Sequence, residues 1–233
     1  MTETATPHYQ YVVEQSKGEF TEQAMVKLSE IYLNNSNWTE AIALLKRLES
    51  EADYPQNIIY AQSNLMNAYY QKEDYSNAEL YATSVLKHSK LDNKIKSDAQ
   101  IIIARSAIKT GDEAKAKNAY AKLETIASGA LAAEALYYSA YFKHKEGQFE
   151  ASNLVVQQLA KDFSSYKYYS AKGLVVMAKN FYALGDAFQA TYILESVIDN
   201  FGEFEDVVSQ AKTELHNIKT EEAKTNSSIQ SDN

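Results

Sequence analysis

Few residues in this chain have the type and spacing that catalysis requires. It contains no Cys, and therefore no thiolate that could act as a nucleophile or a metal ligand. The four His residues fall in different predicted helices, and none has a second His four positions away, so they do not form a metal-binding pair. The sequence has neither a glycine-rich phosphate-binding loop nor a Gly-x-Ser-x-Gly nucleophile motif. These observations predict a protein that is not an enzyme and uses no cofactor or metal.

Recognition of another macromolecule is the chemistry that the side chains do offer. The chain has 18 Tyr residues, and a ring with a hydroxyl at its tip suits a surface that is apolar on one side and wet on the other. Aromatic and basic side chains also dominate the energetics of protein interfaces. The sequence predicts pairs of antiparallel helices, described below. A set of mostly aromatic and basic residues lies on the first helix of these pairs, on the side that faces away from the second helix. We expect this set to contact a partner: Tyr60, Asn67, Tyr70, Arg105, Tyr137, Tyr141, His144, Lys179 and Tyr182.

The formal charge of −8 argues against a nucleic-acid partner, because such a partner requires a basic surface that neutralises phosphates. No apolar run approaches the roughly 18 residues of a membrane span. The first ten residues also lack the basic and apolar regions of a signal peptide. The sequence as given therefore predicts a soluble chain without direct membrane insertion. It would be periplasmic if it is a piece of an exported precursor, and cytoplasmic otherwise.

Residues 171–201 show the element that would position the recognition residues. Apolar residues recur at the i, i+3, i+4 and i+7 spacing between Leu174 and Phe181, which places them on one face of a helix. Gly185 can adopt the left-handed conformation that ends this helix, and Asp186 can cap the next one. The pattern predicts two antiparallel helices joined by a tight turn, and such a pair needs similar neighbours to bury both of its faces.

The same hairpin recurs five times along the chain. A small residue early in each second helix repeats at separations of 37, 38, 36 and 38 residues, and a residue twelve positions earlier marks the first helix. Two helices that cross within about 8–10 Å need small side chains at the crossing. The register therefore predicts the following contacts: Ser29 with Ala41, Met66 with Ala78, Ala104 with Ala116, Ala140 with Ser152, and Ala178 with Ala190.

Each hairpin also carries parts of one longer motif, in which an aliphatic and a small residue precede an aromatic, a Gly-Asp-aromatic turn and an Ala. The copies are Leu28-Ser29…Tyr32…Asn37-Trp38…Ala41, Leu65-Met66…Tyr69…Asp74-Tyr75…Ala78, Ile103-Ala104…Gly111-Asp112…Ala116, Ala140…Gly147-Gln148-Phe149…Ser152 and Met177-Ala178…Phe181…Gly185-Asp186…Ala190. This motif resembles the tetratricopeptide repeat family, although the period here exceeds the roughly 34 residues of that family. The departures are Met66 at a small position, and Ala107 and Lys143 in place of the aromatic.

The resemblance implies an all-α fold, a right-handed superhelical solenoid of about five helix-turn-helix repeats with a concave partner-binding face. The long period and the Tyr-rich connector at 164–169 are similar to the bacterial cell-envelope branch of the family. Asn37 and Glu40 are expected to form a capping box. The predicted parts are a tail and partial helix (1–19), an array (20–202) of repeats at 20–55, 56–92, 93–129, 130–165 and 166–202, a capping helix (203–222) and a disordered tail (223–233).

The function that the sequence favours is a non-enzymatic scaffold that binds a protein or peptide along a Tyr-lined concave groove, as part of a larger cell-envelope protein. The alternative is a structural spacer or self-assembly segment. In that case other copies would meet exposed repeat ends, for example at Tyr9, Val12 and Val13. An enzyme or carbohydrate-handling protein with a deep cleft is the third interpretation, and the identity of the partner stays open.

Overall fold

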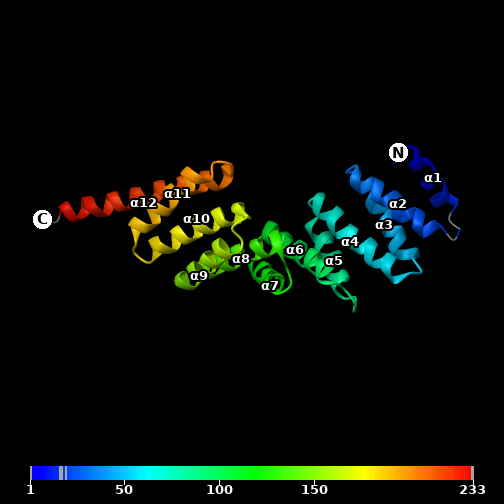
Figure 1. Ribbon diagram of the computed structural model, residues 1–233, viewed down its shortest axis with the longest axis horizontal. Coiled ribbons are helices and arrows are strands. Elements are labelled where there is room, and N and C mark those ends of the chain that lie inside the picture. Colours follow the sequence, from blue (N-terminus) through cyan, green and yellow to red (C-terminus); the bar gives the residue numbers. More distant parts are fainter. Residues whose placement is uncertain (1, 16–17, 19, 232–233) are drawn as a thin grey trace. The chain divides into compact units, whose positions relative to one another are not determined.

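The computed structural model describes residues 2–15, 18 and 20–231, and these residues form twelve α-helices with no strand among them (Figure 1). The predicted all-α hairpin architecture is confirmed. The chain divides into two compact units, one up to Lys122 and one from Leu123 onward. The helices are α1 (Thr2–Gln15), α2 (Thr21–Asn34), α3 (Trp38–Glu51), α4 (Pro55–Gln71), α5 (Tyr75–Leu86), α6 (Asn93–Thr110), α7 (Glu113–Glu124), α8 (Gly129–Lys145), α9 (Phe149–Asp162), α10 (Lys167–Ala183), α11 (Ala187–Asn200) and α12 (Glu205–Ser231).

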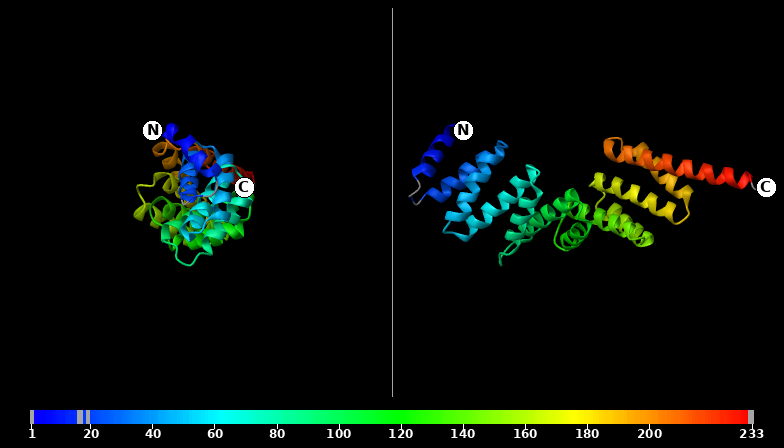
Figure 2. Two further views of the ribbon diagram at one scale, coloured as in Figure 1. Left: turned by 90° about the vertical axis from the view of Figure 1, so that its right-hand side faces the viewer. Right: turned by 180° about the vertical axis from the view of Figure 1, so that it is seen from behind.

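Within each unit the helices stack in chain order. In the first unit, each helix from α1 to α5 contacts the next helix along the chain, and the right-hand view of Figure 2 shows the same order from behind. The first helices of successive hairpins also contact one another, α2 with α4 and α4 with α6. In the second unit, α8 contacts α10 and α10 contacts α12 in the same way. A first helix is therefore covered on several sides, whereas a second helix leaves more of its surface to solvent.

All five hairpin turns have the same backbone geometry. A residue one or two positions after the end of each first helix is left-handed, with φ between 59° and 88°, and the next N–H donates to a carbonyl five residues earlier, at 2.8–3.0 Å. This is the Schellman arrangement, which satisfies carbonyls at the end of a helix. Three of the turns use Gly and two do not. The left-handed residues are Ser36, Glu73, Gly111, Gly147 and Gly185.

The small-residue register is confirmed by burial. All ten residues of the predicted crossings are fully buried. In the fourth hairpin the Ser152 hydroxyl donates to the carbonyl of Ala140 at 2.7 Å, so two residues that the register pairs are in direct contact. Because the crossings leave no solvent-accessible space, larger side chains would have to displace one helix from the other.

Of four local predictions at the ends of helices, one is confirmed and three need correction. Asp186 caps α11 as predicted, since its Oδ1 accepts from the N–H of Gln189 at 2.9 Å. Asn37 makes no such bond at α3, and no capping box forms there. A tail was expected to precede the partial helix of residues 1–19, but α1 begins at Thr2 and holds Pro7 within its first two turns. The tail at 223–233 was expected to be disordered, but α12 continues through Ser231, because neither Gly nor Pro interrupts the sequence; residues 232–233 lie outside the described residues.

Candidate functional site

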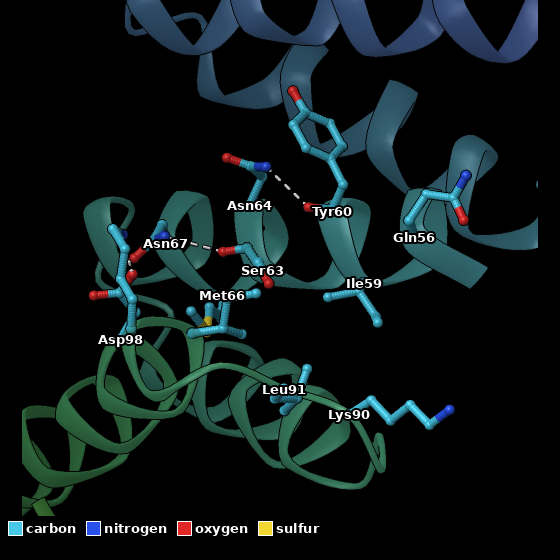
Figure 3. A pocket seen from close by; sticks show the side chains of 12 residues that line it. Gln56, Ile59, Tyr60, Ser63, Asn64, Met66, Asn67, Lys90, Leu91 and Asp98 are labelled. Carbon is cyan, nitrogen blue, oxygen red and sulfur yellow. Dashed lines mark hydrogen bonds and ion pairs between the residues drawn. The ribbon is translucent and has the colours of Figure 1, made fainter. Parts of the chain in front are cut away.

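A pocket of about 440 Å³ opens between α4 and α6, beside the connection from α5 to α6 (Figure 3). Both helices are the first of their hairpins, so the pocket lies on the face where the sequence predicts partner contact. Its floor is apolar, because Ile59, Met66, Leu91 and Ile95 line it, and Met66 and Leu91 are themselves buried. The polar and charged lining residues are Gln56, Tyr60, Ser63, Asn64, Asn67, Lys90, Lys94 and Asp98.

Two amide side chains of α4 are held in place by their own helix. The Nδ2 of Asn64 donates to the carbonyl of Tyr60 at 2.9 Å, and the Nδ2 of Asn67 donates to the carbonyl of Ser63 at 3.0 Å. Figure 3 shows both bonds. Each bond uses one N–H and leaves the second N–H and the amide oxygen without a partner among the described residues. Each side chain therefore presents one donor and one acceptor, the same pair that a peptide backbone offers.

The rim of the pocket carries both signs of charge. The Nζ of Lys94 lies 2.6 Å from the Oδ2 of Asp98, one turn further along α6. The hydrogen bond to Asp98 and the negative charge of its carboxylate raise the pKa of Lys94. Lys90 projects outward from the connection between α5 and α6 (Figure 3). A segment that enters the pocket would therefore meet an apolar floor, amide groups beside it and an ion pair at its edge.

Tyr60 joins the pocket to the preceding hairpin. Its hydroxyl lies 3.0 Å from the Oγ of Ser29, which occupies the crossing of α2 with α3. It also lies 3.4 Å from the carbonyl of Val26. Burial raises the pKa of Tyr60, and the bond to Ser29 opposes that rise. Part of the Tyr60 side chain therefore packs between α2 and α4, and the rest lines the pocket.

The other predicted contacts in the first unit lie apart from the pocket. Tyr70 packs edge to face against Tyr75, with ring centroids 5.6 Å apart. Arg105 is half-buried on α6. Of the residues named as the exposed end of the array, Val13 is buried, and Tyr9 and Val12 are half-buried against the hairpin that follows. Gln10 of α1 also donates to the hydroxyl of Tyr32 at 3.1 Å, so α1 is a docked element.

In the second unit, Tyr137 is buried among side chains of its own unit. It is 7% exposed, and the Nζ of Lys172 lies 4.5 Å from its ring centroid. Tyr141 and Tyr169 lie 6.4 and 6.2 Å from the same ring. Burial among these rings strongly raises the pKa of Tyr137, and burial lowers the pKa of Lys172. The expectation that Tyr137 lines an open groove is therefore corrected: the position lies between successive first helices, α8 and α10.

His144 ends a short chain of polar groups that reaches the core. Its Nδ1 lies 2.7 Å from the Oδ1 of Asn180, and the Nδ2 of Asn180 donates to the Oδ1 of Asn153 at 2.8 Å. Because the Asn180 oxygen can only accept, the proton of this bond resides on the His144 Nδ1. Asn180 is fully buried. The His144 side chain therefore has a structural partner rather than a free face.

Lys179 and Tyr182 face α12. The Nζ of Lys179 lies 2.9 Å from the Oε1 of Glu214. Partial burial raises the pKa of Tyr182, and the nearby carboxylates of Glu222 and Glu221 add to the rise. Among the predicted contacts, the structure brings Tyr60 and Asn67 together at the pocket, and Tyr137 and Tyr141 together between α8 and α10.

The pocket also uses residues that were not predicted as contacts. Gln56 lies one turn before Tyr60 on α4. It could have been predicted by extending the partner-facing side of this helix by one turn toward its N-terminus. Lys90 and Leu91 belong to a connection, where no periodic pattern indicates which side chains turn inward. Ser63 and Asp98 occupy the same helix face as the predicted contacts, and the structure places both at the pocket.

Over the part of the chain that the structure describes, no group of three or more His, Asp or Glu side chains has a geometry suited to a metal ion. None of the described helices has both the length and the apolar composition to span a bilayer.

Comparisons with known proteins agree with the hairpin architecture. A family model described as tetratricopeptide repeat matches residues 23–56, which span α2, α3 and the start of α4. Among solved structures, the crystal structure of a tetratricopeptide repeat protein from Parabacteroides merdae is similar, with a TM-score of 0.53. The match covers 91% of this chain and 92% of that chain at 10% identity, so the likeness concerns the fold. A search of curated proteins gives no match.

Proposed function

We propose that this chain, which has the fold of a tetratricopeptide repeat protein and matches the repeat model at residues 23–56, is a non-enzymatic scaffold that binds an extended polypeptide in the pocket between α4 and α6. The observation that carries the proposal is the pair of amides, Asn64 and Asn67, held beside an apolar floor. A peptide in extended conformation has a free backbone donor and acceptor at every residue. The two amides can pair with these groups whatever the side chains of the peptide are.

The floor of the pocket would supply the selectivity. Ile59, Met66, Leu91 and Ile95 present apolar surface, and burial of one aliphatic or aromatic side chain there contributes about 1.5–3 kcal/mol. A volume of about 440 Å³ accommodates one large side chain and its flanking backbone. We therefore expect the preferred partner to carry one large apolar residue in an otherwise polar, extended segment.

Selection from a random peptide library displayed on phage tests the proposal. The selected peptides are then synthesised with a fluorescent label, and their affinity for the full chain is measured by anisotropy. The double variant Asn64→Ala and Asn67→Ala should weaken binding about tenfold or more, because the peptide backbone loses the hydrogen bonds of both amides. The matched control is Asn118→Ala, the same substitution on the exposed surface of the second helix α7, which should leave the affinity unchanged.

Two results would contradict the proposal. One is that library selection yields no peptide whose binding depends on Asn64 and Asn67. The other is that the double variant and the Asn118→Ala control bind the selected peptides equally, which would place the binding surface elsewhere on the chain. Circular dichroism of each variant shows whether the fold is retained.

A further inference from the structure

The second helix of the last hairpin, α11, has an exposed strip of unusual composition. Phe188 and Tyr192 lie one turn apart and are 81% and 62% exposed. Glu195 and Asp199 continue the same line toward the C-terminal end of the helix, and both are exposed. Residues three or four positions apart share one face of a helix. These four side chains, called the α11 strip, thus lead from two aromatic rings to two carboxylates.

The other four second helices provide an internal comparison. Counted from the buried small residue, the same positions in these hairpins hold no aromatic residue, and the last two hold no carboxylate. In three of the hairpins one of the last two positions is a Lys. The equivalents are Thr39, Ala43, Lys46 and Ser50; Ser76, Leu80, Thr83 and Lys87; Ala114, Asn118, Ala121 and Thr125; and Glu150, Leu154, Gln157 and Lys161.

Folding does not require the α11 strip. The buried face of α11 consists of Ala190, Ile193, Leu194 and Val197, on the opposite side of the helix. Two large aromatic side chains in water contribute no burial to the fold, so their presence at these positions indicates a contact that forms outside it.

The charges on α11 indicate the kind of partner. The helix has no Lys or Arg. Glu195 pairs with Lys219 of α12 at 2.8 Å, in a bridge whose two side chains are both more than half exposed. Asp199 has no partner among the described residues. We propose that the α11 strip docks an amphipathic helix of a partner protein, whose apolar face ends in Lys or Arg.

The geometry favours a helix as the occupant. The strip spans twelve residues of a helix, about 16 Å from its first residue to its last, and a second helix can pack its own side-chain ridge along this line over three turns. A second copy of this chain is disfavoured, since the unit from Leu123 onward carries fifteen Asp and Glu against nine Lys. An anionic lipid surface would meet the same repulsion from Glu195 and Asp199.

A designed peptide tests this proposal with the full chain. The probe is a labelled amphipathic helix of roughly 18 residues, or five turns, made of Leu, Ala and Lys, with Leu on one face and Lys at one end of that face. Its counterpart has Glu in place of every Lys. We expect the Lys peptide to bind, and the double variant Phe188→Gln and Tyr192→Gln to weaken its binding about tenfold or more. Asp199→Lys should weaken it further at low salt.

Leu154→Gln is the matched control, because Leu154 is an equally exposed apolar residue at the equivalent position of α9. This variant should bind the Lys peptide with unchanged affinity. Equal binding of the Lys peptide by the chain and by the Phe188→Gln, Tyr192→Gln variant would overturn the proposal, as would equal binding of the Lys and Glu peptides. If sedimentation detects self-association of the chain that the double variant abolishes, the strip binds a second copy of the chain rather than a partner helix, and the proposal is wrong. The proposal is independent of peptide binding between α4 and α6.

Discussion

Replacing the left-handed residue of a hairpin turn should change stability in opposite directions at different repeats. Gly147 and Ser36 occupy equivalent positions in the fourth and first hairpins, with φ of 75° and 59°. Gly147→Ala introduces a side chain where the backbone disfavours one, whereas Ser36→Gly removes one. We expect the first substitution to destabilise the protein and the second to stabilise it.

The structure isolates the backbone contribution. A Cβ added at Gly147 would meet no heavy atom within 4 Å, so the cost of Gly147→Ala comes from the left-handed conformation alone. That conformation costs a residue with a side chain about 1–2 kcal/mol. The lower entropy of Ala in the unfolded chain offsets about 0.4–1 kcal/mol of this cost. We therefore expect Gly147→Ala to destabilise by about 1 kcal/mol, and Ser36→Gly to stabilise by about 0.5 kcal/mol.

Urea unfolding monitored by far-ultraviolet circular dichroism measures both changes. Trp38 is the single Trp of the chain and lies two residues after Ser36, so its fluorescence reports separately on the first hairpin. Gly202→Ala is the control, since Gly202 also has open space around it but does not have a left-handed φ. The control should be neutral or slightly stabilising.

Two outcomes would refute this account of the turns. If Gly147→Ala and Gly202→Ala have the same effect, the left-handed conformation has no energetic cost at Gly147. If Ser36→Gly destabilises the protein, the Ser36 side chain has a stabilising role that outweighs the backbone cost.

Three further perturbations test packing, polar burial and pH. Ala190→Leu should overpack the crossing with α10 and cost about 1–3 kcal/mol, and unfolding with an unchanged urea midpoint would contradict the register. Asn180→Ala should cost about 1–3 kcal/mol, because it leaves His144 and the buried Asn153 without their partner, and urea titration against Asn217→Ala on α12 as a control measures the difference. Burial, reinforced by the hydrogen bond to Asp206, raises the pKa of Tyr168 from about 10 to about 12. The folded state therefore holds this proton more tightly, so the stabilisation is complete below pH 10 and is lost as the pH rises through 12; Tyr168→Phe should flatten this part of the stability profile, and an unchanged profile would contradict it.

The hairpins could be predicted because their determinants are local or periodic. A small residue every 36 to 38 positions and the turn residue five positions before it fix where each pair of helices meets. Ser36 and Glu73 show the limit of residue type as a guide, since both occupy the turn that Gly occupies elsewhere. The backbone hydrogen bonds of the turn impose the conformation on them.

The candidate site was less predictable, because it depends on the spacing between helices of different hairpins. Tyr137 was expected in an open groove, but the approach of α10 to α8 covers it and places Lys172 over its ring. Tyr60 and Asn67 were expected on the partner-facing side of α4, and both line the pocket. Leu91 contributes to the floor from a connection, whose path the periodicity of the helices does not determine.

The nature of the partner follows from still finer features. Sequence patterns indicated a surface rich in Tyr, whereas the amides of Asn64 and Asn67 gain significance only from their bonds to α4 and from the apolar floor beside them. The α11 strip lies outside the helix face that the hairpin analogy favours. It emerges only when exposure is compared across equivalent positions of the repeats.

Methyl spectra of the full chain, recorded with and without a peptide selected from the library, test the central claim most directly. Binding between α4 and α6 predicts shifted resonances for Ile59, Met66 and Ile95, while Ile193 on α11 stays unchanged. Peptide binding that leaves the resonances of Ile59, Met66 and Ile95 unchanged, or that shifts Ile193 instead, would contradict the account.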